Sequence, residues 1–145
     1  MQIQNITIHN FRSIKDISFN LSDYSLLVGE NNSGKSSILT ALRILYDNDG
    51  IKYIEARDFP KFTTNDNESW IEVEFLTSDD EQNTLKNEYK SKDNILKIRR
   101  YFISKVKDKV KSNQSNIYAY ENGVLSDHLF YGAKNVSEAK IGRVI

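Results

Sequence analysis

One run of residues in this chain has the composition and spacing needed to bind phosphate. Residues 29–36 are Gly-Glu-Asn-Asn-Ser-Gly-Lys-Ser, the pattern G-x-x-x-x-G-K-S. Backbone N–H groups in such a loop form an anion-binding nest, and the helix that follows adds the positive end of its dipole. The run follows the apolar residues 26–28 and precedes a helix-like stretch, 37–46. This strand–loop–helix context predicts a nucleotide-binding P-loop and disfavours a simple helix cap, which needs neither the first Gly nor the Lys.

The positions of the loop have distinct predicted roles. Gly29 permits the sharp turn out of the strand, and Gly34 removes a Cβ where the backbone approaches phosphate. Lys35 supplies positive charge to the β- and γ-phosphates and is the candidate catalytic residue. The Ser36 hydroxyl is the predicted ligand of Mg²⁺. The remaining candidate phosphate contacts are Asn31, Asn32, Ser33 and Ser37, the last of these toward the α-phosphate.

The composition limits the classes to which the protein can belong. Its 145 residues make about one domain, large enough for a real core. The absence of cysteine excludes disulfides and cysteine-based zinc sites. No apolar run approaches the length of about 18 residues that a spanning helix needs, and the N-terminus lacks a signal-peptide pattern. We therefore expect a soluble, cytoplasmic protein without a membrane partner.

The formal net charge is zero, but the charge is uneven along the chain. Residues 90–111 carry nine basic and two acidic side chains, and Lys105, Lys107, Lys109 and Lys111 alternate with other residues. At the period of a strand these four lysines share one face. Two interpretations remain: a surface that contacts DNA phosphates, or the solvated tip of a hairpin. The second is favoured because charge runs most often form solvated faces.

The elements that must position the loop are predicted from periodicity. Strands are expected at 2–9, 17–21, 70–76 and 95–103, the first two antiparallel and the third half-exposed. The capping box Ser-Asp-Asp-Glu at 78–81 predicts a helix to about Tyr89.

Asn122 and Gly123 predict a tight hairpin turn. The fold class is therefore α/β. We expect a mixed sheet with residues 26–29 as a central strand, and an antiparallel layer from 2–21, 70–76, 95–103 and 117–125.

Other titratable residues give no catalytic pattern. His9 and His128 have no clustered partners in the sequence, which favours structural or surface roles. The acids Glu72 and Glu74 alternate along a predicted strand and indicate a solvated face. We predict no metal site or acid–base pair from them.

Two segments carry a resemblance to a known family. Residues 6–14, Ile-Thr-Ile-His-Asn-Phe-Arg-Ser-Ile, and residues 29–39 resemble the opening of the RecF/SMC branch of ABC-type ATPases. Asn32 departs from the Gly common there, but Asn tolerates a left-handed backbone. Glu-Asn-Asn-Ser at 30–33, together with Ala-Arg-Asp-Phe at 56–59, is similar to the OLD nucleases, which join an ATPase to a Toprim nuclease.

The resemblance implies properties that the residues alone do not show. The fold would be a P-loop NTPase, the N-terminal lobe of an ABC-type ATPase, with ATP and Mg²⁺ as cofactors. Arg12 would lie close to the bound phosphates and add bidentate charge. Two ATPase heads would sandwich ATP as a homodimer, and the parent protein would act on DNA.

Other motifs that ATP hydrolysis needs in this branch do not occur in the sequence. A Q-loop, a Leu-Ser-Gly-Gly-like signature and an apolar strand ending in Asp-Glu (Walker B) are absent. We therefore expect residues 1–145 to be the N-terminal portion of an ATPase domain, truncated before these motifs. This portion would bind ATP–Mg²⁺ weakly, or not detectably, and would not hydrolyse it.

Three functions remain open at this point. The leading one is the ATPase lobe of an OLD-like DNA endonuclease that serves in defence against phage. The second is a RecF- or SMC-like DNA-repair or DNA-clamping ATPase. The third is a stand-alone, non-catalytic nucleotide-binding module.

Overall fold

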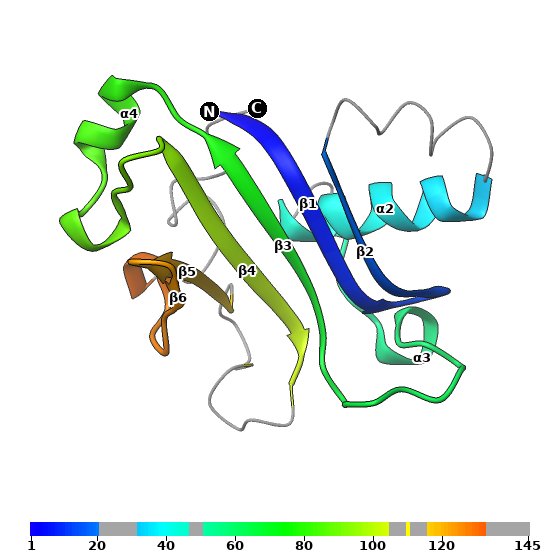
Figure 1. Ribbon diagram of the computed structural model, residues 1–145. Helices are drawn as coiled ribbons and strands as arrows, with labels where there is room; N and C mark the ends of the chain where they lie inside the picture. Colours follow the sequence, from blue (N-terminus) through cyan, green and yellow to red (C-terminus); the bar gives the residue numbers. More distant parts are fainter. Residues whose placement is uncertain (21–31, 47–50, 105–109, 111–115, 133–145) are drawn as a thin grey trace.

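The computed structural model describes residues 1–20, 32–46, 51–104, 110 and 116–132, with the backbone alone for 32–35. Predictions that fall on the other residues lie outside this part, including the central strand at 26–29 and the lysine run of 105–111. Figure 1 shows a twisted sheet with the longest described helix across one face. Within the described residues, no helix is long and apolar enough to cross a membrane.

The described strands form one six-stranded sheet in the order β2-β1-β3-β4-β5-β6, and every pairing is antiparallel. This confirms the predicted antiparallel layer and the antiparallel pairing of the first two strands. The strands are β1 (Gln2–Phe11), β2 (Ile14–Asn20), β3 (Ser69–Leu76), β4 (Ile95–Ile103), β5 (Ile117–Glu121) and β6 (Val124–Leu125).

The described helices are short except for one. They are α2 (Asn32–Leu45), α3 (Glu55–Asp58) and α4 (Asp79–Thr84), with the 3₁₀ turns η2 (Asn87–Tyr89) and η3 (Phe130–Gly132). The predicted helix at 37–46 therefore begins earlier, inside the P-loop pattern itself. Isolated helices of about 12–15 residues or fewer are marginal in water, so α2, with 14 residues, depends on packing one face against the sheet.

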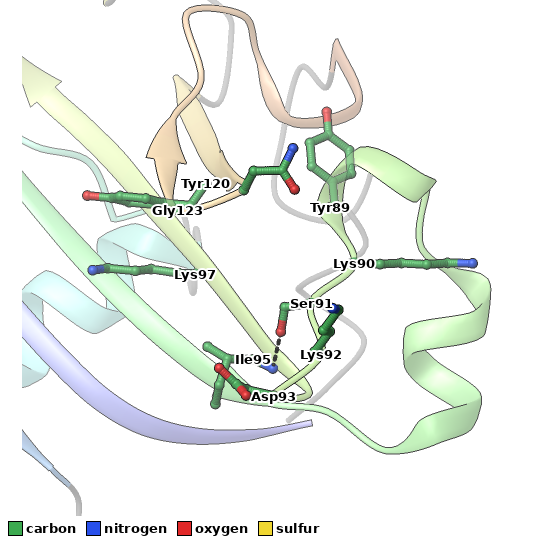
Figure 2. A pocket seen from close by; sticks show the side chains of 10 residues that line it. Tyr89, Lys90, Ser91, Lys92, Asp93, Ile95, Lys97, Tyr120 and Gly123 are labelled. Carbon is green, nitrogen blue, oxygen red and sulfur yellow. Dashed lines mark hydrogen bonds between the residues drawn. The ribbon is translucent and has the colours of Figure 1, made fainter.

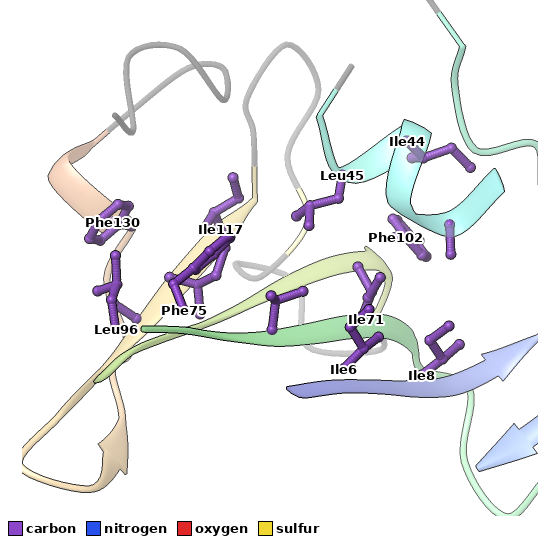
Figure 3. Close-up of a cluster of buried hydrophobic side chains, with 14 of the residues drawn as sticks. Ile6, Ile8, Ile44, Leu45, Ile71, Phe75, Leu96, Phe102, Ile117 and Phe130 are labelled. Carbon is purple, nitrogen blue, oxygen red and sulfur yellow. The ribbon is translucent and has the colours of Figure 1, made fainter. Parts of the chain in front are cut away.

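The core lies between α2 and the sheet. Ile38, Ala41, Ile44 and Leu45 are buried on one side of the helix, at the spacing of a helical face. Figure 3 shows Ile44 and Leu45 of α2 in one buried cluster with strand residues such as Ile71. Alternate residues of β1 supply the opposing surface, because successive strand side chains point to opposite faces.

Two turns use left-handed backbone conformations. In the β5–β6 hairpin, Asn122 has φ 52° and Gly123 has φ 79°, which is the pattern of a type I′ turn and confirms the prediction. In the β1–β2 turn, Arg12 has φ 55° although it is not Gly or Asn. Such a conformation costs a non-glycine residue free energy unless its surroundings hold it.

Two sequence predictions need correction. The helix after Ser78 has the expected capping box, with Glu81 N–H donating to Ser78 Oγ, but it ends at Thr84 and not near Tyr89. It ends there because Leu85 takes an extended conformation that buries its side chain.

β3 is a central strand, because β1 and β4 pair along its two edges. One of its faces is buried and Trp70 and Glu74 on the other face are partly exposed, as predicted, but Glu72 departs from this pattern. Glu72 is buried and not solvated, because Arg99 and Tyr120 cover it and satisfy its carboxylate.

Candidate nucleotide-binding site

The P-loop pattern runs directly into α2. Gly29 and Asn31 lie outside the described residues, whereas Asn32, Ser33, Gly34 and Lys35 form the first turn of the helix. The first turn contains no acidic residue, so its side chains would not repel an anion bound at the positive end of the helix.

The next two serines differ in exposure. Ser36 is exposed, and its backbone carbonyl accepts a hydrogen bond from Thr40 Oγ1 at 2.8 Å. Ser37 is buried. An exposed hydroxyl on the second turn fits the hard oxygen ligand that Mg²⁺ takes from proteins.

Arg12 is held by a buried carboxylate. Its Nε donates to Asp58 Oδ1 at 3.0 Å, and its backbone N–H donates to the carbonyl of Asp58 at 2.6 Å. These two bonds fix the β1–β2 turn against α3 and explain how Arg12 tolerates its positive φ. The guanidinium remains one-quarter exposed. The predicted contact of Arg12 with phosphate stays a prediction.

Asp58 accepts from three sources and is fully buried. Arg57 donates to both carboxylate oxygens at 2.8 Å, and Ile54 N–H donates to Oδ2 at 2.9 Å, in addition to the bond from Arg12. Burial by itself would raise the pKa of Asp58, but the hydrogen bonds from Arg57, Ile54 and Arg12 outweigh it and lower the pKa. The carboxylate is therefore ionised at neutral pH.

A basic cavity opens beside this cluster. Its volume is about 520 Å³, and it lies at the β1–β2 turn end of the sheet, beside α3. It combines three cationic side chains with two aromatic ones, a composition suited to an anionic ligand with a flat apolar part. Its lining is Arg12, Ser13, Arg57, Phe59, Lys61 and Phe62. The sequence singled out 56–59 only by resemblance and did not reveal this cavity.

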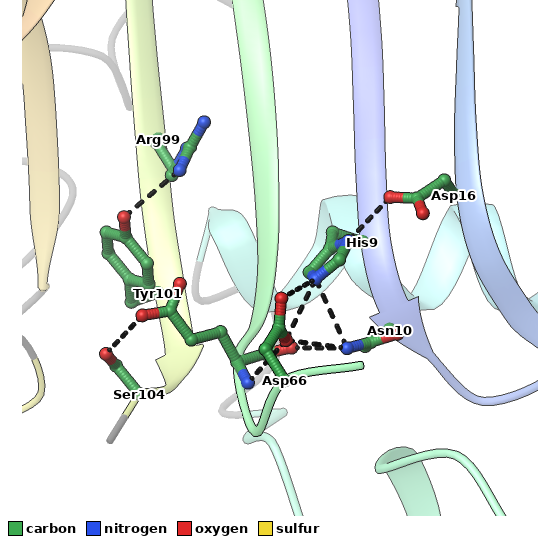
Figure 4. A network of polar contacts seen from close by, with 8 residues as sticks. His9, Asn10, Asp16, Asp66, Arg99, Tyr101 and Ser104 are labelled. Carbon is green, nitrogen blue, oxygen red and sulfur yellow. Dashed lines mark hydrogen bonds and ion pairs between the residues drawn. The ribbon is translucent and has the colours of Figure 1, made fainter. Parts of the chain in front are cut away.

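His9 has partners that sequence reasoning missed (Figure 4). Its Nδ1 lies 2.5 Å from Asp16 Oδ1, its Nε2 lies 3.0 Å from Asp66 Oδ2, and its ring stacks on Trp70. Burial would lower the pKa of His9, but hydrogen bonds to the two carboxylates outweigh it and raise the pKa. The prediction that His9 lacks clustered partners is wrong. Asp66 lies 57 residues away in the sequence, and only the fold brings it close.

A second cavity lies at the other end of the sheet. Its volume is about 650 Å³, and Figure 2 shows Lys90, Lys92 and Lys97 around it with Tyr89 and Tyr120. Lys97 already has partners: its Nζ lies 3.5 Å from Glu72 and 3.6 Å from Glu74, and 4.5 Å from the Tyr120 ring centre.

The described arginines of the basic stretch serve the fold. Arg99 donates to Glu72 Oε1 at 3.0 Å and lies 3.8 Å above the Trp70 ring. Arg100 donates from Nη1 to the carbonyls of Ile44 and Leu45, at 2.6 and 3.0 Å. It therefore satisfies carbonyls at the C-terminal end of α2. For these two residues the interpretation as a DNA surface is not supported by their contacts.

Comparison with known proteins defines the class. The AAA ATPase domain family matches residues 1–142, and the chain belongs to this family. A solved chain of an SMC ATPase superposes on this chain with a TM-score of 0.55. That structure was solved in work on ATP-driven dimerization and DNA stimulated activation of SMC ATPases. That alignment covers 100% of this chain and 85% of the other at 18% identity, which shows a shared fold.

Sequence relatives narrow the class further. Endonuclease GajA of Bacillus cereus is 37% identical over 65 residues, which are 44% of this chain and 11% of that protein. The Old nuclease of Escherichia phage P2 is 43% identical over 47 residues, 32% of this chain and 8% of that one. An uncharacterized protein of Methanocaldococcus jannaschii, MJECL10, is 33% identical over 106 residues, in a match that covers 61% of this chain and 48% of that protein.

These matches confirm the resemblance inferred from residues 6–14 and 29–39: the chain is similar to the OLD-like ABC-type ATPases and has a P-loop NTPase fold. It spans less than half the length of each of these relatives.

Proposed function

We propose that this chain is the ATP–Mg²⁺-binding N-terminal lobe of an OLD-like, ATP-dependent DNA endonuclease. The observation that carries the proposal is the continuity of the G-x-x-x-x-G-K-S pattern with α2, a 14-residue helix with no acid in its first turn. The relatives named as nucleases support the link to DNA cleavage. In this proposal the parent protein is a cytoplasmic enzyme that serves in defence against phage.

Different residues of the P-loop pattern contact the phosphates and Mg²⁺ in this proposal. Backbone N–H groups from Asn31 to Ser37 bind the phosphates, and Gly29 and Gly34 give the backbone its close approach. Lys35 stabilises charge on the β- and γ-phosphates, and the exposed Ser36 hydroxyl holds Mg²⁺. Mg²⁺ would supply charge neutralisation between phosphate oxygens.

Arg12 adds the second cation to this site. Asp58 fixes the guanidinium through Nε, which leaves its two terminal nitrogens to reach a phosphate. The basic cavity that Arg12 shares with Arg57 and Lys61 supports an anionic ligand at this end of the sheet.

Residues 1–145 form the N-terminal portion of the ATPase domain in this proposal. The matches to GajA and the Old nuclease cover only 11% and 8% of those proteins, which supports further segments that carry the Q-loop, the signature motif and Walker B. Without these groups the portion binds ATP but does not hydrolyse it. Two heads that sandwich ATP would then act as a homodimeric clamp on DNA.

An SMC- or RecF-like DNA-clamping ATPase is the second candidate, favoured by the superposition on an SMC ATPase. Any sequence that follows residue 145 in the parent protein would discriminate between the two candidates. A carboxylate-rich Toprim domain identifies the nuclease, whereas a long heptad repeat identifies the clamp. If neither follows, a non-catalytic nucleotide-binding module remains.

Binding of a fluorescent ATP analogue with Mg²⁺ tests the proposal. Lys35→Ala should weaken binding about 10- to 100-fold, since a hydrogen bond to a charged group contributes about 1.5–3 kcal/mol. Lys15→Ala, which removes an exposed lysine of β2, is the matched control and should bind like the wild type. Equal binding by wild type and Lys35→Ala would refute the phosphate role, and ATP turnover that depends on Lys35 would refute the predicted lack of hydrolysis.

A further inference from the structure

Three side chains of metal-ligating type converge at the β5–β6 edge of the sheet. Glu88 comes from η2, Glu121 ends β5, and His128 follows β6. One ligand atom of each lies within 4.8 Å of the other two. The cluster is separate from the P-loop helix, which covers the sheet near β1 and β3.

The hydrogen bonds around His128 favour one tautomer of its ring. Ser126 Oγ donates to the His128 carbonyl at 3.2 Å and accepts from the His128 backbone N–H at 3.1 Å. With the Ser126 proton on that carbonyl, the 3.0 Å contact between Ser126 Oγ and Nδ1 favours the tautomer in which Nδ1–H donates. The carboxylate of Asp127, 3.3 Å from Nδ1, favours the same tautomer. The neutral ring therefore keeps the lone pair on Nε2.

The lone pair on His128 Nε2 lies next to the carboxylate of Glu121. Nε2 lies 2.9 Å from Glu121 Oε1, an oxygen that is buried and has no hydrogen-bond partner among the described residues. The contact is short but does not have hydrogen-bond geometry, so Oε1 lies off the axis of the ring nitrogen. Two acceptors this close repel each other unless a proton or a metal ion joins them, and a buried carboxylate oxygen without a hydrogen bond is costly.

We propose that Glu88, Glu121 and His128 form a binding site for a divalent transition-metal ion of the Zn²⁺ type. Ligands at about 2.0–2.2 Å from Zn²⁺ lie about 3.3 Å from one another in a tetrahedral arrangement. The 2.9 Å pair is close to this spacing, and the exposed Glu88 can close the remaining gap by side-chain rotation. An off-axis oxygen next to Nε2 is what two ligands of one ion require.

The types of the three ligand atoms also favour some metal ions over others. One imidazole nitrogen with two carboxylates suits Zn²⁺ or Mn²⁺, whereas Mg²⁺ prefers oxygen ligands and retains its waters. Ser126 and Asp127 provide the outer hydrogen bonds that orient a ligating histidine. The bound ion would join η2 to the β5–β6 hairpin and stabilise the folded chain by mass action.

Calorimetric titration of the tag-free chain, stripped with EDTA and without nucleotide, tests this site. ZnCl₂ should bind with one ion per chain and raise the melting temperature, and MgCl₂ should do neither. Co²⁺ should give the visible absorption of a tetrahedral site. Leaving out nucleotide separates this result from the metal site of the P-loop, so failure here leaves the proposed ATPase function untouched.

Variants assign the ligands. His128→Ala should abolish the Co²⁺ spectrum, and Glu88→Gln should weaken Zn²⁺ binding at least about tenfold. Asp80→Asn removes an exposed acid of α4 outside the cluster and should bind Zn²⁺ like the wild type. No Zn²⁺ binding by the wild type, or binding that persists in His128→Ala, would overturn the proposal and leave a simple His128–Glu121 ion pair.

Discussion

The two edges of the sheet carry charged clusters that differ in how fully their polar atoms are used. At the β1–β2 edge, Asp58 is buried and both of its oxygens accept hydrogen bonds, from Arg12, Arg57 and Ile54. At the β5–β6 edge, a buried oxygen of Glu121 lies 2.9 Å from His128 Nε2 but has no hydrogen-bond partner among the residues that the structure describes. A satisfied carboxylate positions other groups, whereas an unsatisfied one retains the capacity to bind a ligand.

Removing the charge of Asp58 should have the largest effect on stability. Asp58→Asn leaves two cations around a neutral amide and should lower the free energy of unfolding by about 2–4 kcal/mol. Urea denaturation measures this, with Glu55→Gln on the exposed side of α3 as the control. A loss no larger than in the control would show that the cluster contributes little.

The same carboxylate predicts an acid dependence. Its pKa is lowered in the folded state, so its contribution is present above the unfolded value of about 4 and is lost as the pH falls through the folded pKa. The difference in stability between wild type and Asp58→Asn should therefore shrink below about pH 4.

Arg12 should affect nucleotide binding more than Arg57 does, although both hold Asp58. Arg12→Ala should weaken binding of the ATP analogue about tenfold, the effect of one charge-assisted contact worth about 1.4 kcal/mol. Arg57→Ala is the matched control because it removes the other guanidinium of the same cluster. If both variants bind nucleotide equally well, Arg12 acts only through the fold.

His9 should make stability fall as the pH rises. Its pKa is raised by Asp16 and Asp66 against the effect of burial, so its contribution is complete below the unfolded value of about 6.5. It is lost as the pH rises through the folded pKa, with a change of about 1 kcal/mol for a partly exposed pair. Asp66→Asn should flatten this slope, measured by urea denaturation at several pH values, and an unchanged slope would assign the dependence to another group.

The hairpin turn should have the smallest effect. Gly123→Ala meets no atom within 4 Å but places a Cβ at φ 79°, which should cost about 0.5–1 kcal/mol. Because Glu121 and His128 flank this turn, Zn²⁺ binding should weaken while ATP binding does not change. Parallel titrations with both ligands check this, and an equal loss of the two would mean that the edges are coupled.

Local signals predicted much of the fold. The G-x-x-x-x-G-K-S pattern, the Asn122-Gly123 turn and the Ser78 capping box each depend on neighbours within a few residues, and the structure contains the turn and the cap as predicted. Alternation likewise located the described strands. The phosphate contacts of the loop remain a prediction.

Long-range partners explain what the sequence did not predict. Glu72 was expected in solvent because its strand alternates, but Arg99 and Tyr120 cover it, and the Tyr120 hydroxyl donates to its carboxylate. Burial, together with this hydrogen bond, raises the pKa of Tyr120 to about 12. The partners of His9 and of Asp58 come from segments more than 40 residues away. No local pattern encodes such pairs.

The hydrogen bonds from Arg100 to the last carbonyls of α2 attach the C-terminal end of this helix to β4. With 14 residues, α2 is about 21 Å long. A small displacement of β4 would therefore be transmitted along the axis to the residues of the P-loop pattern, and force applied there would return to the sheet by the same route. Through Arg100, the antiparallel layer is thus connected mechanically to the residues of the P-loop pattern.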